Sequence, residues 1–163
     1  MSAPSPPEAM TRRFAIVIPA YNHGKQLHEV LGKTLRLGFP VFVVDDGSTD
    51  LSALIAQSYP EVQYAYQEHQ GVAAARNAGL AAARGEIIAL QDADDLWVAG
   101  KLALQVGYLL GHPDVHGTFG MQLNFADGTL PAKPSIGVPD RVSLGTLVAR
   151  RVLFDRVGAY DTT

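Results

Sequence analysis

Short apolar runs that alternate with helical segments constrain the fold of this chain more than any other feature. We predict strands at residues 14–18, 41–44, 62–66 and 86–90. We predict helices at residues 24–37, 51–58, 71–84 and 97–110. Strands that are apolar throughout are buried on both faces, and alternation with helices is typical of parallel sheets. The order therefore predicts an α/β fold with a mostly parallel central sheet covered by helices on both faces.

The two ends of the chain differ from this regular middle part. Residues 1–12 are rich in Pro and Ser and lack the apolar stretch of a signal peptide, so we predict a disordered leader. Residues 13–163 are expected to form one domain, because 163 residues is a usual size for a single domain. Near the C-terminus we predict a strand, a turn, a loop, a strand and a helix at residues 115–125, 127–128, 132–140, 144–149 and 151–157.

Composition excludes several classes of function. The net charge is −3 and Lys and Arg are not clustered, which argues against nucleic acid or an anionic membrane as a partner. The chain has no cysteine, so disulfides, thiolate nucleophiles and zinc thiolate sites are excluded. No window is long and apolar enough to predict a membrane span.

Polar turns follow three of the predicted strands, at residues 19–22, 45–50 and 91–95. The carboxyl ends of parallel strands meet at one edge of the sheet, and ligands of such sheets bind beyond that edge. We therefore expect the three turns to lie close together and to form the binding site.

The second and third turns carry six carboxylates. Clustered carboxylates repel one another unless a cation compensates, and a hard divalent ion such as Mg²⁺ or Mn²⁺ does so with ligand phosphate oxygens completing its shell. Asp92 and Asp94 stand two residues apart at a strand end, so a tight turn can aim both at one ion. A calcium loop of the EF-hand type fails, because its twelfth position is Ala103 and not Glu. Solvated turn and helix-cap aspartates are the alternative.

Several segments together resemble the family-2 glycosyltransferases, which have the GT-A fold, a Rossmann-like three-layer α/β/α sandwich. The segments that carry the resemblance are VIPAYN at 17–22, VVDDGSTD at 43–50, GVAAARN at 71–77, GEII at 85–88, DADDLW at 92–97 and VGAYD at 157–161. Each segment alone is weak, and their order and spacing over residues 13–161 make the resemblance specific.

The resemblance implies a role for each turn in binding a nucleotide-sugar. The first turn and the second would line the base, with Tyr21 as an aromatic face and Asp46, or alternatively Asp45, accepting a hydrogen bond from the base. The third turn would approach the ribose and hold the metal, with Asp94 as the direct ligand and Asp92 beside it. The nucleotide-sugar residues implied in this way are Pro19, Ala20, Tyr21, Asn22, Asp45, Asp46, Gly47, Arg76, Asp92 and Ala93.

Some of these residues have simpler explanations. Tyr21 can pack at a strand end, and Asp45 and Asp46 can cap a helix. Arg76 would sit near the base or a phosphate, and an ion pair with an acidic turn is the alternative. Trp97 is assigned to the core. The histidines have no spacing typical of a metal site and are interpreted as structural, namely His23, His69, His112 and His116.

The implied reaction is transfer of a sugar from a nucleoside diphosphate, with uridine diphosphate as the default, to a hydroxyl of a saccharide or lipid-linked acceptor, with inversion and with Mn²⁺ or Mg²⁺ as cofactor. The family's general base lies downstream of the segment matched by Gly158–Asp161, so we name no catalytic residue and expect the base beyond Thr163. On this interpretation the chain is truncated before the acceptor region, and it binds the donor but turns over poorly.

Two alternatives to a sugar transferase remain from other classes of protein. A non-catalytic nucleotide-sugar-binding or scaffold module is the first, and a downstream acidic pair in the full-length protein would argue against it. A nucleotidyltransferase is the second, and it is disfavoured because Pro19–Asn22 stands where a Gly-rich loop is expected. The resemblance also implies polysaccharide synthesis in the cytoplasm, or at the cytoplasmic face of the membrane for a longer protein.

Overall fold

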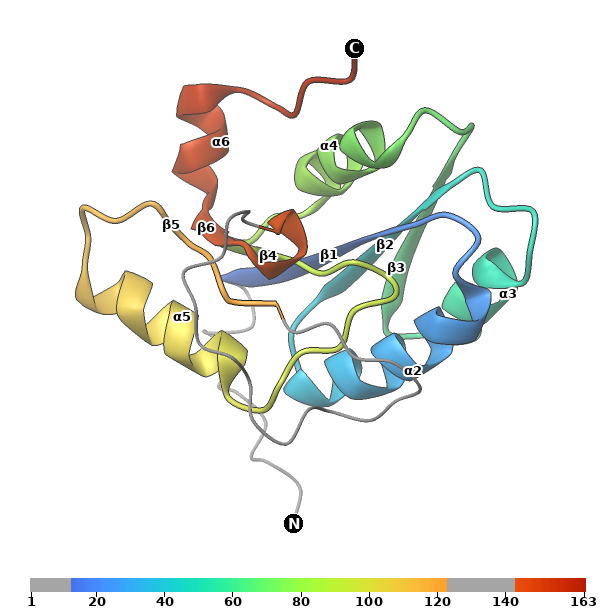
Figure 1. Ribbon diagram of the computed structural model, residues 1–163, viewed down its shortest axis with the longest axis horizontal. Coiled ribbons are helices and arrows are strands. Elements are labelled where there is room, and N and C mark those ends of the chain that lie inside the picture. Colours follow the sequence, from blue (N-terminus) through green and yellow to red (C-terminus); the bar gives the residue numbers. More distant parts are fainter. Residues whose placement is uncertain (1–12, 123–142) are drawn as a thin grey trace.

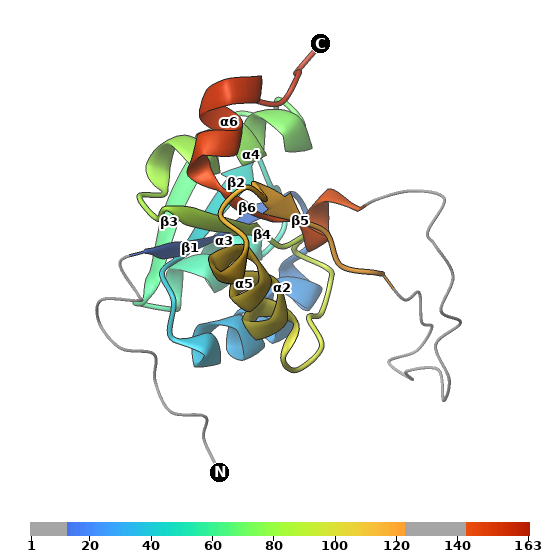
Figure 2. The same ribbon diagram turned by 90° about the vertical axis from the view of Figure 1, so that its left-hand side faces the viewer.

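The computed structural model describes residues 13–122 and 143–163. The predicted leader at 1–12, the turn at 127–128 and the loop at 132–140 lie outside the described residues, and so does the last part of the strand predicted at 115–125. The described residues form a sheet with helices on both of its faces (Figures 1 and 2).

The central sheet has six strands in the order β3-β2-β1-β4-β6-β5. Four strands are parallel, namely β1 (Phe14–Ala20), β2 (Val41–Asp46), β3 (Val62–Gln67) and β4 (Ile87–Leu90). The short strands β6 (Val148–Arg150) and β5 (Gly117–Thr118) extend the sheet beyond β4 with antiparallel pairing. The mostly parallel sheet predicted from the apolar runs is thereby confirmed.

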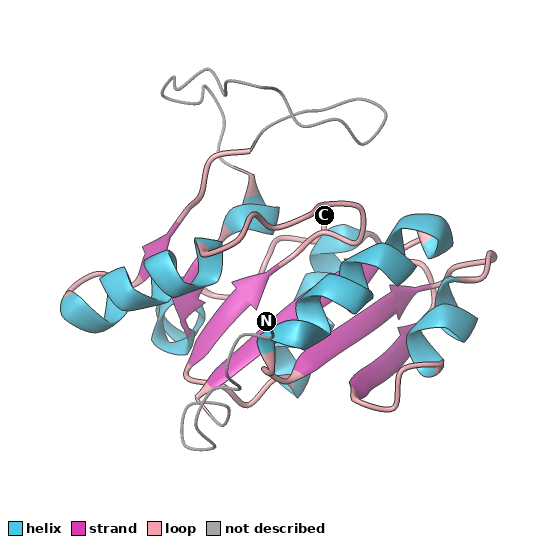
Figure 3. Ribbon diagram, turned by 90° about the horizontal axis from the view of Figure 1, so that it is seen from below, coloured by secondary structure: helices cyan, strands magenta, loops and turns pink. Residues whose placement is uncertain are grey.

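The helices form two layers. One face of the sheet carries α2 (Gly24–Thr34), α3 (Ser52–Gln57) and α5 (Lys101–Gly111), and the other carries α4 (Val72–Ala82) and α6 (Arg151–Val157) (Figures 1 and 3). Because successive side chains of a strand point to opposite faces, each central strand supplies both cores. In β1, for example, Ile16 and Ile18 pack in the first core, and Ala15 and Val17 in the second.

Three predicted elements differ from the structure. The predicted helix at 97–110 begins at Lys101, since Gly100 before it has a φ of +83°. The predicted strand at 144–149 begins instead with the short 3₁₀ helix η2 (Leu144–Thr146), because the Thr146 hydroxyl donates to the Ser143 carbonyl at 2.7 Å and closes a turn. Of the predicted strand at 115–125, the described part pairs only at Gly117–Thr118.

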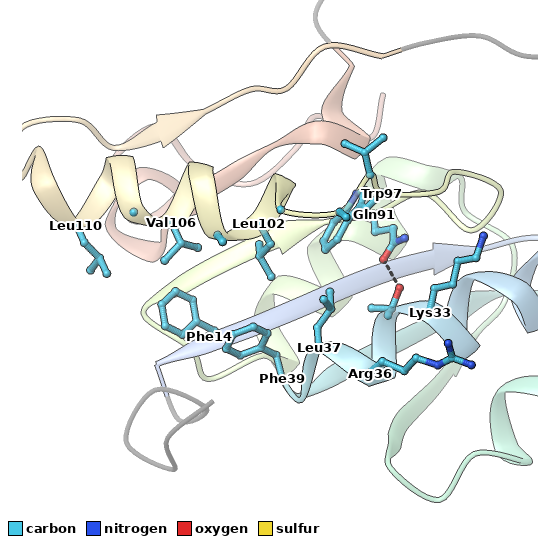
Figure 4. Close-up of a pocket in the computed structure, with 16 residues that line it drawn as sticks. Phe14, Lys33, Arg36, Leu37, Phe39, Gln91, Trp97, Leu102, Val106 and Leu110 are labelled. Atoms are coloured by element: carbon cyan, nitrogen blue, oxygen red, sulfur yellow. Dashed lines mark hydrogen bonds between the residues drawn. The ribbon is translucent and has the colours of Figure 1, made fainter. Parts of the chain in front are cut away.

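Two hollows lie on this framework. The first is polar and lies at the carboxyl ends of the parallel strands. The second is apolar and lies on the face of the sheet that α2 and α5 cover, between α5 and the 3₁₀ helix η1 (Leu35–Leu37) that continues α2 (Figure 4). Among the described residues, no helix is both long and apolar enough to cross a membrane.

Candidate functional site

The polar hollow is a pocket of about 290 Å³ that gathers the ends of all four parallel strands. Its walls come from the loops after β1, β2, β3 and β4 and from the first two turns of α4. The lining residues are Pro19, Ala20, Tyr21, His23, Asp46, His69, Val72, Ala75, Arg76, Asp92, Ala93 and Asp94. The three turns expected to converge from the sequence do meet here.

Three residues predicted to bind the nucleotide-sugar do not line the pocket, namely Asn22, Asp45 and Gly47. The carboxylate of Asp45 is buried, and it accepts hydrogen bonds from the Ser48 backbone N–H at 2.8 Å and from the Tyr64 hydroxyl at 2.9 Å. Burial and the nearby Asp45 carboxylate raise the pKa of Tyr64 to about 12. Asp45 thus stabilises the second turn but does not cap a helix, because α3 begins only at Ser52 and has no side-chain cap.

Asn22 and Gly47 hold neighbouring loops of the pocket against one another. Asn22 has a φ of +55°, and its side-chain oxygen accepts from the Thr49 backbone N–H at 2.8 Å. Gly47 has a φ of +79°, and a side chain there would come within 2.7 Å of the backbone nitrogen of His69. Only glycine tolerates both that φ and that approach.

Asp46 is buried at the base of the pocket and already has four hydrogen-bond donors. Its Oδ1 accepts from the Gln67 side chain at 2.7 Å and from the Gln70 backbone at 2.9 Å. Its Oδ2 accepts from the Gly71 backbone at 2.8 Å and lies 2.8 Å from Nδ1 of His69. Burial alone would raise the pKa of Asp46, and these donors outweigh burial and lower it. Its carboxylate therefore fixes residues 67–71, whatever its part in binding a base.

Two histidines interpreted as structural from the sequence in fact line the pocket, His23 and His69. The ring of His69 stacks on Tyr21 with centroids 4.0 Å apart and an interplanar angle of 23°. Its Nδ1 faces two acceptors of Asp46, the carboxylate and the backbone carbonyl, so Nδ1 carries a proton. The sequence does place His69 here by position, because it follows β3 and every parallel strand of the sheet ends at this edge.

Arg76 projects from α4 into the pocket with only 9% of its surface exposed. Its Nη2 donates to Oδ1 of Asp92 at 2.7 Å, so the ion pair weighed as an alternative is present. Its guanidinium carbon lies 6.0 Å from the centre of the Tyr160 ring. Within residues 13–122 and 143–163, Nε of Arg76 is buried without a hydrogen-bond partner. The guanidinium therefore retains a donor that no described residue uses.

The acidic turn brings Asp92 and Asp94 to the same pocket wall. Burial, together with the charges of Asp92 and Asp94, raises the pKa of the neighbouring Asp95. In the described part of the chain, no group of three His, Cys, Asp or Glu residues could hold a metal by itself. Two carboxylates on one wall suit a Mg²⁺ or Mn²⁺ ion whose other ligands are water and phosphate oxygens.

The end of the described chain packs against this acidic turn. A side chain at Gly145, in η2, would come within 2.4 Å of Oδ2 of Asp92. Farther on, the backbone N–H and carbonyl of Tyr160 bond to the side chain of Asn77 on α4, both at 2.8 Å. Trp97 lies partly buried against the core, as assigned from the sequence, and its Nε1 donates to the Gly145 carbonyl at 3.4 Å.

Known proteins with similar sequences carry transferase names. Residues 15–137 match the family described as Glycosyl transferase family 2. An uncharacterized glycosyltransferase of Nostoc sp. is 35% identical over 98 residues, which are 55% of this chain and 30% of that protein. The putative teichuronic acid biosynthesis glycosyltransferase TuaG of Bacillus subtilis is 28% identical over 137 residues, 79% of this chain and 54% of the relative.

Solved structures with the same fold include S. aureus TarS 1-349, with a TM-score of 0.71 and 22% identity over 91% of this chain and 50% of that one. The glucosyl-3-phosphoglycerate synthase of M. tuberculosis has a TM-score of 0.56 and 23% identity over 67% of this chain and 44% of its own. These likenesses establish the GT-A fold. The chain spans about half or less of the length of these proteins. Because the family model matches most of the chain, it belongs to glycosyl transferase family 2.

Proposed function

We propose that the polar pocket binds a nucleoside diphosphate sugar together with a divalent metal ion. The observation that carries this proposal is the meeting of an aromatic face, a buried guanidinium and two carboxylates on one pocket wall. These groups match the base, the diphosphate and the metal ion of such a donor. TarS, which shares the fold, has been crystallised with UDP-GlcNAc and with UDP, which supports a uridine donor.

The metal ion would be held by Asp94 and Asp92. Bound there, it would stabilise the charge that develops on the leaving diphosphate. Arg76 forms an ion pair with Asp92 at 2.7 Å. Without a ligand, the carboxylate of Asp92 is therefore already paired, and it lies beside the more exposed Asp94. We infer that the ion binds weakly alone and tightly with the diphosphate, whose oxygens complete its shell.

Arg76 would help to receive the diphosphate. Arg76 lines the pocket, and its Nη2 holds Asp92 in place. A charge-assisted bond to a buried guanidinium is stronger than one to a neutral donor, which favours an anionic ligand at this point.

We further propose transfer of the sugar to a hydroxyl of a saccharide or lipid-linked acceptor, with inversion at the anomeric carbon. The name of TuaG, a relative assigned to teichuronic acid biosynthesis, supports a role in polysaccharide synthesis. No residue of the polar pocket is assigned as the general base, because Asp92 and Asp94 are committed to the leaving group in this proposal.

Isothermal calorimetry with uridine, thymidine and guanosine diphosphates tests the proposal, each measured with and without Mn²⁺. We expect one of them to bind, and its affinity to be clearly higher with the metal than without it. Mn²⁺ alone should bind much more weakly than it does in the presence of that nucleotide. If none of the three binds with metal present, the pocket is not a donor site. Tight binding of Mn²⁺ alone would contradict the shared site for metal and diphosphate.

A further inference from the structure

The apolar hollow is the larger of the two, with a volume of about 520 Å³, and the donor site makes no use of it. One wall is the row of Leu102, Val106 and Leu110 along α5, and the other is η1 and the end of α2 (Figure 4). Phe14 and Phe39 lie between these walls with ring centroids 5.3 Å apart. We call this hollow the α5–η1 groove.

The few polar groups of the groove are arranged at one side. Lys33 and Arg36 project from the α2–η1 wall, and none of the lining residues within 13–122 and 143–163 is acidic. Lys33 pairs with Glu29 at 2.7 Å, while Arg36 has no ion pair within the described residues. The charge of the groove is thus positive in a protein whose net charge is −3.

The uncharged polar groups at the groove are already satisfied. The Thr34 hydroxyl donates to the side-chain oxygen of Gln91 at 2.7 Å, and the amide nitrogen of Gln91 donates to the Asp95 carbonyl at 3.2 Å. Among the described residues, the groove therefore offers a peptide backbone no uncharged side chain that lacks a partner, whereas an alkyl chain needs none.

The middle of α5 carries a glycine at the groove. Gly107 lines the groove, and an added Cβ would meet nothing within 4 Å. Glycine inside a helix costs about 1 kcal/mol relative to alanine, and the packing of α5 does not require it. At the rim, Val98 and Leu110 expose 59% and 41% of their surface. Among the described residues, the rim of the groove is therefore exposed at Val98 and Leu110.

We propose that the α5–η1 groove binds a linear anionic amphiphile, an alkyl chain with a phosphate or carboxylate head. The chain lies between α5 and the Phe14–Phe39 pair, and the head lies at Arg36 and Lys33. The volume is within the range of about 300–1,000 Å³ of small-molecule pockets, and burial of the chain supplies the affinity. The anionic head supplies a partner for Arg36, which has no ion pair among the described residues, and lies near Lys33, which pairs with Glu29.

This site is separate from the donor pocket, although both use one segment of the chain. Gln91 and Trp97 line the groove, whereas Asp92, Ala93 and Asp94 line the polar pocket. The proposal does not rest on the donor site, so the variant Asp94→Ala is expected to keep amphiphile binding even if it loses nucleotide binding.

Trp97 provides a direct measurement, because it is the only tryptophan of the chain and it lines the groove. Tryptophan emission is followed while decyl phosphate is added below its critical micelle concentration. We expect a saturable change, at least tenfold weaker binding of decanol, and no change with inorganic phosphate. Equal binding of decanol and decyl phosphate would overturn the assignment of an anionic head, and no response to either would overturn the site.

Matched variants locate the binding. Gly107→Leu and Ala103→Leu each place a side chain in the groove and should abolish the response, whereas Gly111→Leu, at the end of α5 and outside the lining, should keep it. Circular dichroism confirms that each variant is folded. A response that survives in both folded groove variants would show that the groove is not the site.

The charge of the head is tested by single substitutions. Arg36→Gln should weaken decyl phosphate binding about tenfold, the equivalent of one charge-assisted contact. Lys25→Gln removes the same charge from an exposed position of α2 outside the groove and should have no effect. Equal losses in the two variants would contradict a specific contact. Emission that changes with protein concentration alone, and does not do so in Gly107→Leu, would identify a second copy of the chain as the occupant instead.

Discussion

The polar pocket and the α5–η1 groove are built by opposite means. The polar pocket is made by loops at the ends of four parallel strands, and its buried charges are paired, as in Arg76 and Asp92. The α5–η1 groove is made by a gap in a helix layer, and its walls are carbon with two cations at one side. The larger hollow is thus not the one equipped for chemistry. Volume reflects how helices pack, whereas function depends on which polar groups converge.

Substitution of Asp94 should give the largest effect, because it should weaken ligand binding in the polar pocket and leave the α5–η1 groove unaffected. Asp94→Ala removes the exposed carboxylate proposed as metal ligand, and we expect the metal-dependent part of nucleotide affinity to fall on the order of 100-fold. The melting temperature should stay unchanged, because the residue lies on a turn. Asp114→Ala removes the same charge from an exposed position outside the pocket and should bind normally. A metal response that persists in Asp94→Ala would show that the ligand assignment is wrong.

Two aromatic stacks of nearly equal geometry allow a matched test of the polar pocket, with a smaller expected change in nucleotide affinity. Tyr21 stacks on His69, and Tyr108 stacks on His112, both with centroids 4.0 Å apart, and only the first pair lines the pocket. His69→Ala should weaken nucleotide binding roughly fivefold, through loss of about 1 kcal/mol of stacking and of support for Tyr21. Calorimetry on His112→Ala should give the affinity of the parent chain. If the two variants behave alike, the Tyr21 stack has no part in binding.

The pH dependence of stability gives the smallest expected effect and tests how the pocket is held. The pKa of Asp46 in the folded protein lies below its usual 3.8, so its ionised form stabilises the fold at higher pH. That contribution is complete above the unfolded pKa and is lost as the pH falls through the lowered folded value. Thermal melts of the parent and Asp46→Asn should therefore differ above about pH 5 and converge at lower pH. A difference independent of pH would mean that the carboxylate charge does not hold residues 67–71.

The fold could be predicted from the sequence because its strands are apolar on both faces. The runs that became β1, β2 and β4 are buried along their whole length, and no other arrangement hides them. The convergence of three turns followed from the parallel direction alone. The short elements after Gly111 were less predictable, because hydrogen bonds such as that of Thr146 to Ser143 decide between a turn and a strand.

The site itself could be predicted only in part. Asp45 and Asp46 are neighbours in a strand, so they point to opposite faces, yet both are buried and the sequence does not say which one faces the pocket. The pairing of Arg76 with Asp92 was one of two open alternatives, since it depends on the distance between α4 and β4. His69 could not be predicted from its spacing, because it belongs to no metal-binding pattern, and in the structure its ring stacks on Tyr21. The groove had no signal beyond a glycine in the middle of a helix.

Segment 91–97 forms a common wall between the two hollows, with Gln91 and Trp97 on one side and Asp92 and Asp94 on the other. A ligand that shifted this wall from the groove side would alter the affinity of the acidic turn for metal and diphosphate. By thermodynamic linkage, the donor would then alter the affinity of the groove by the same factor. A single seven-residue stretch would in that case make two chemically unrelated ligands each other's effectors.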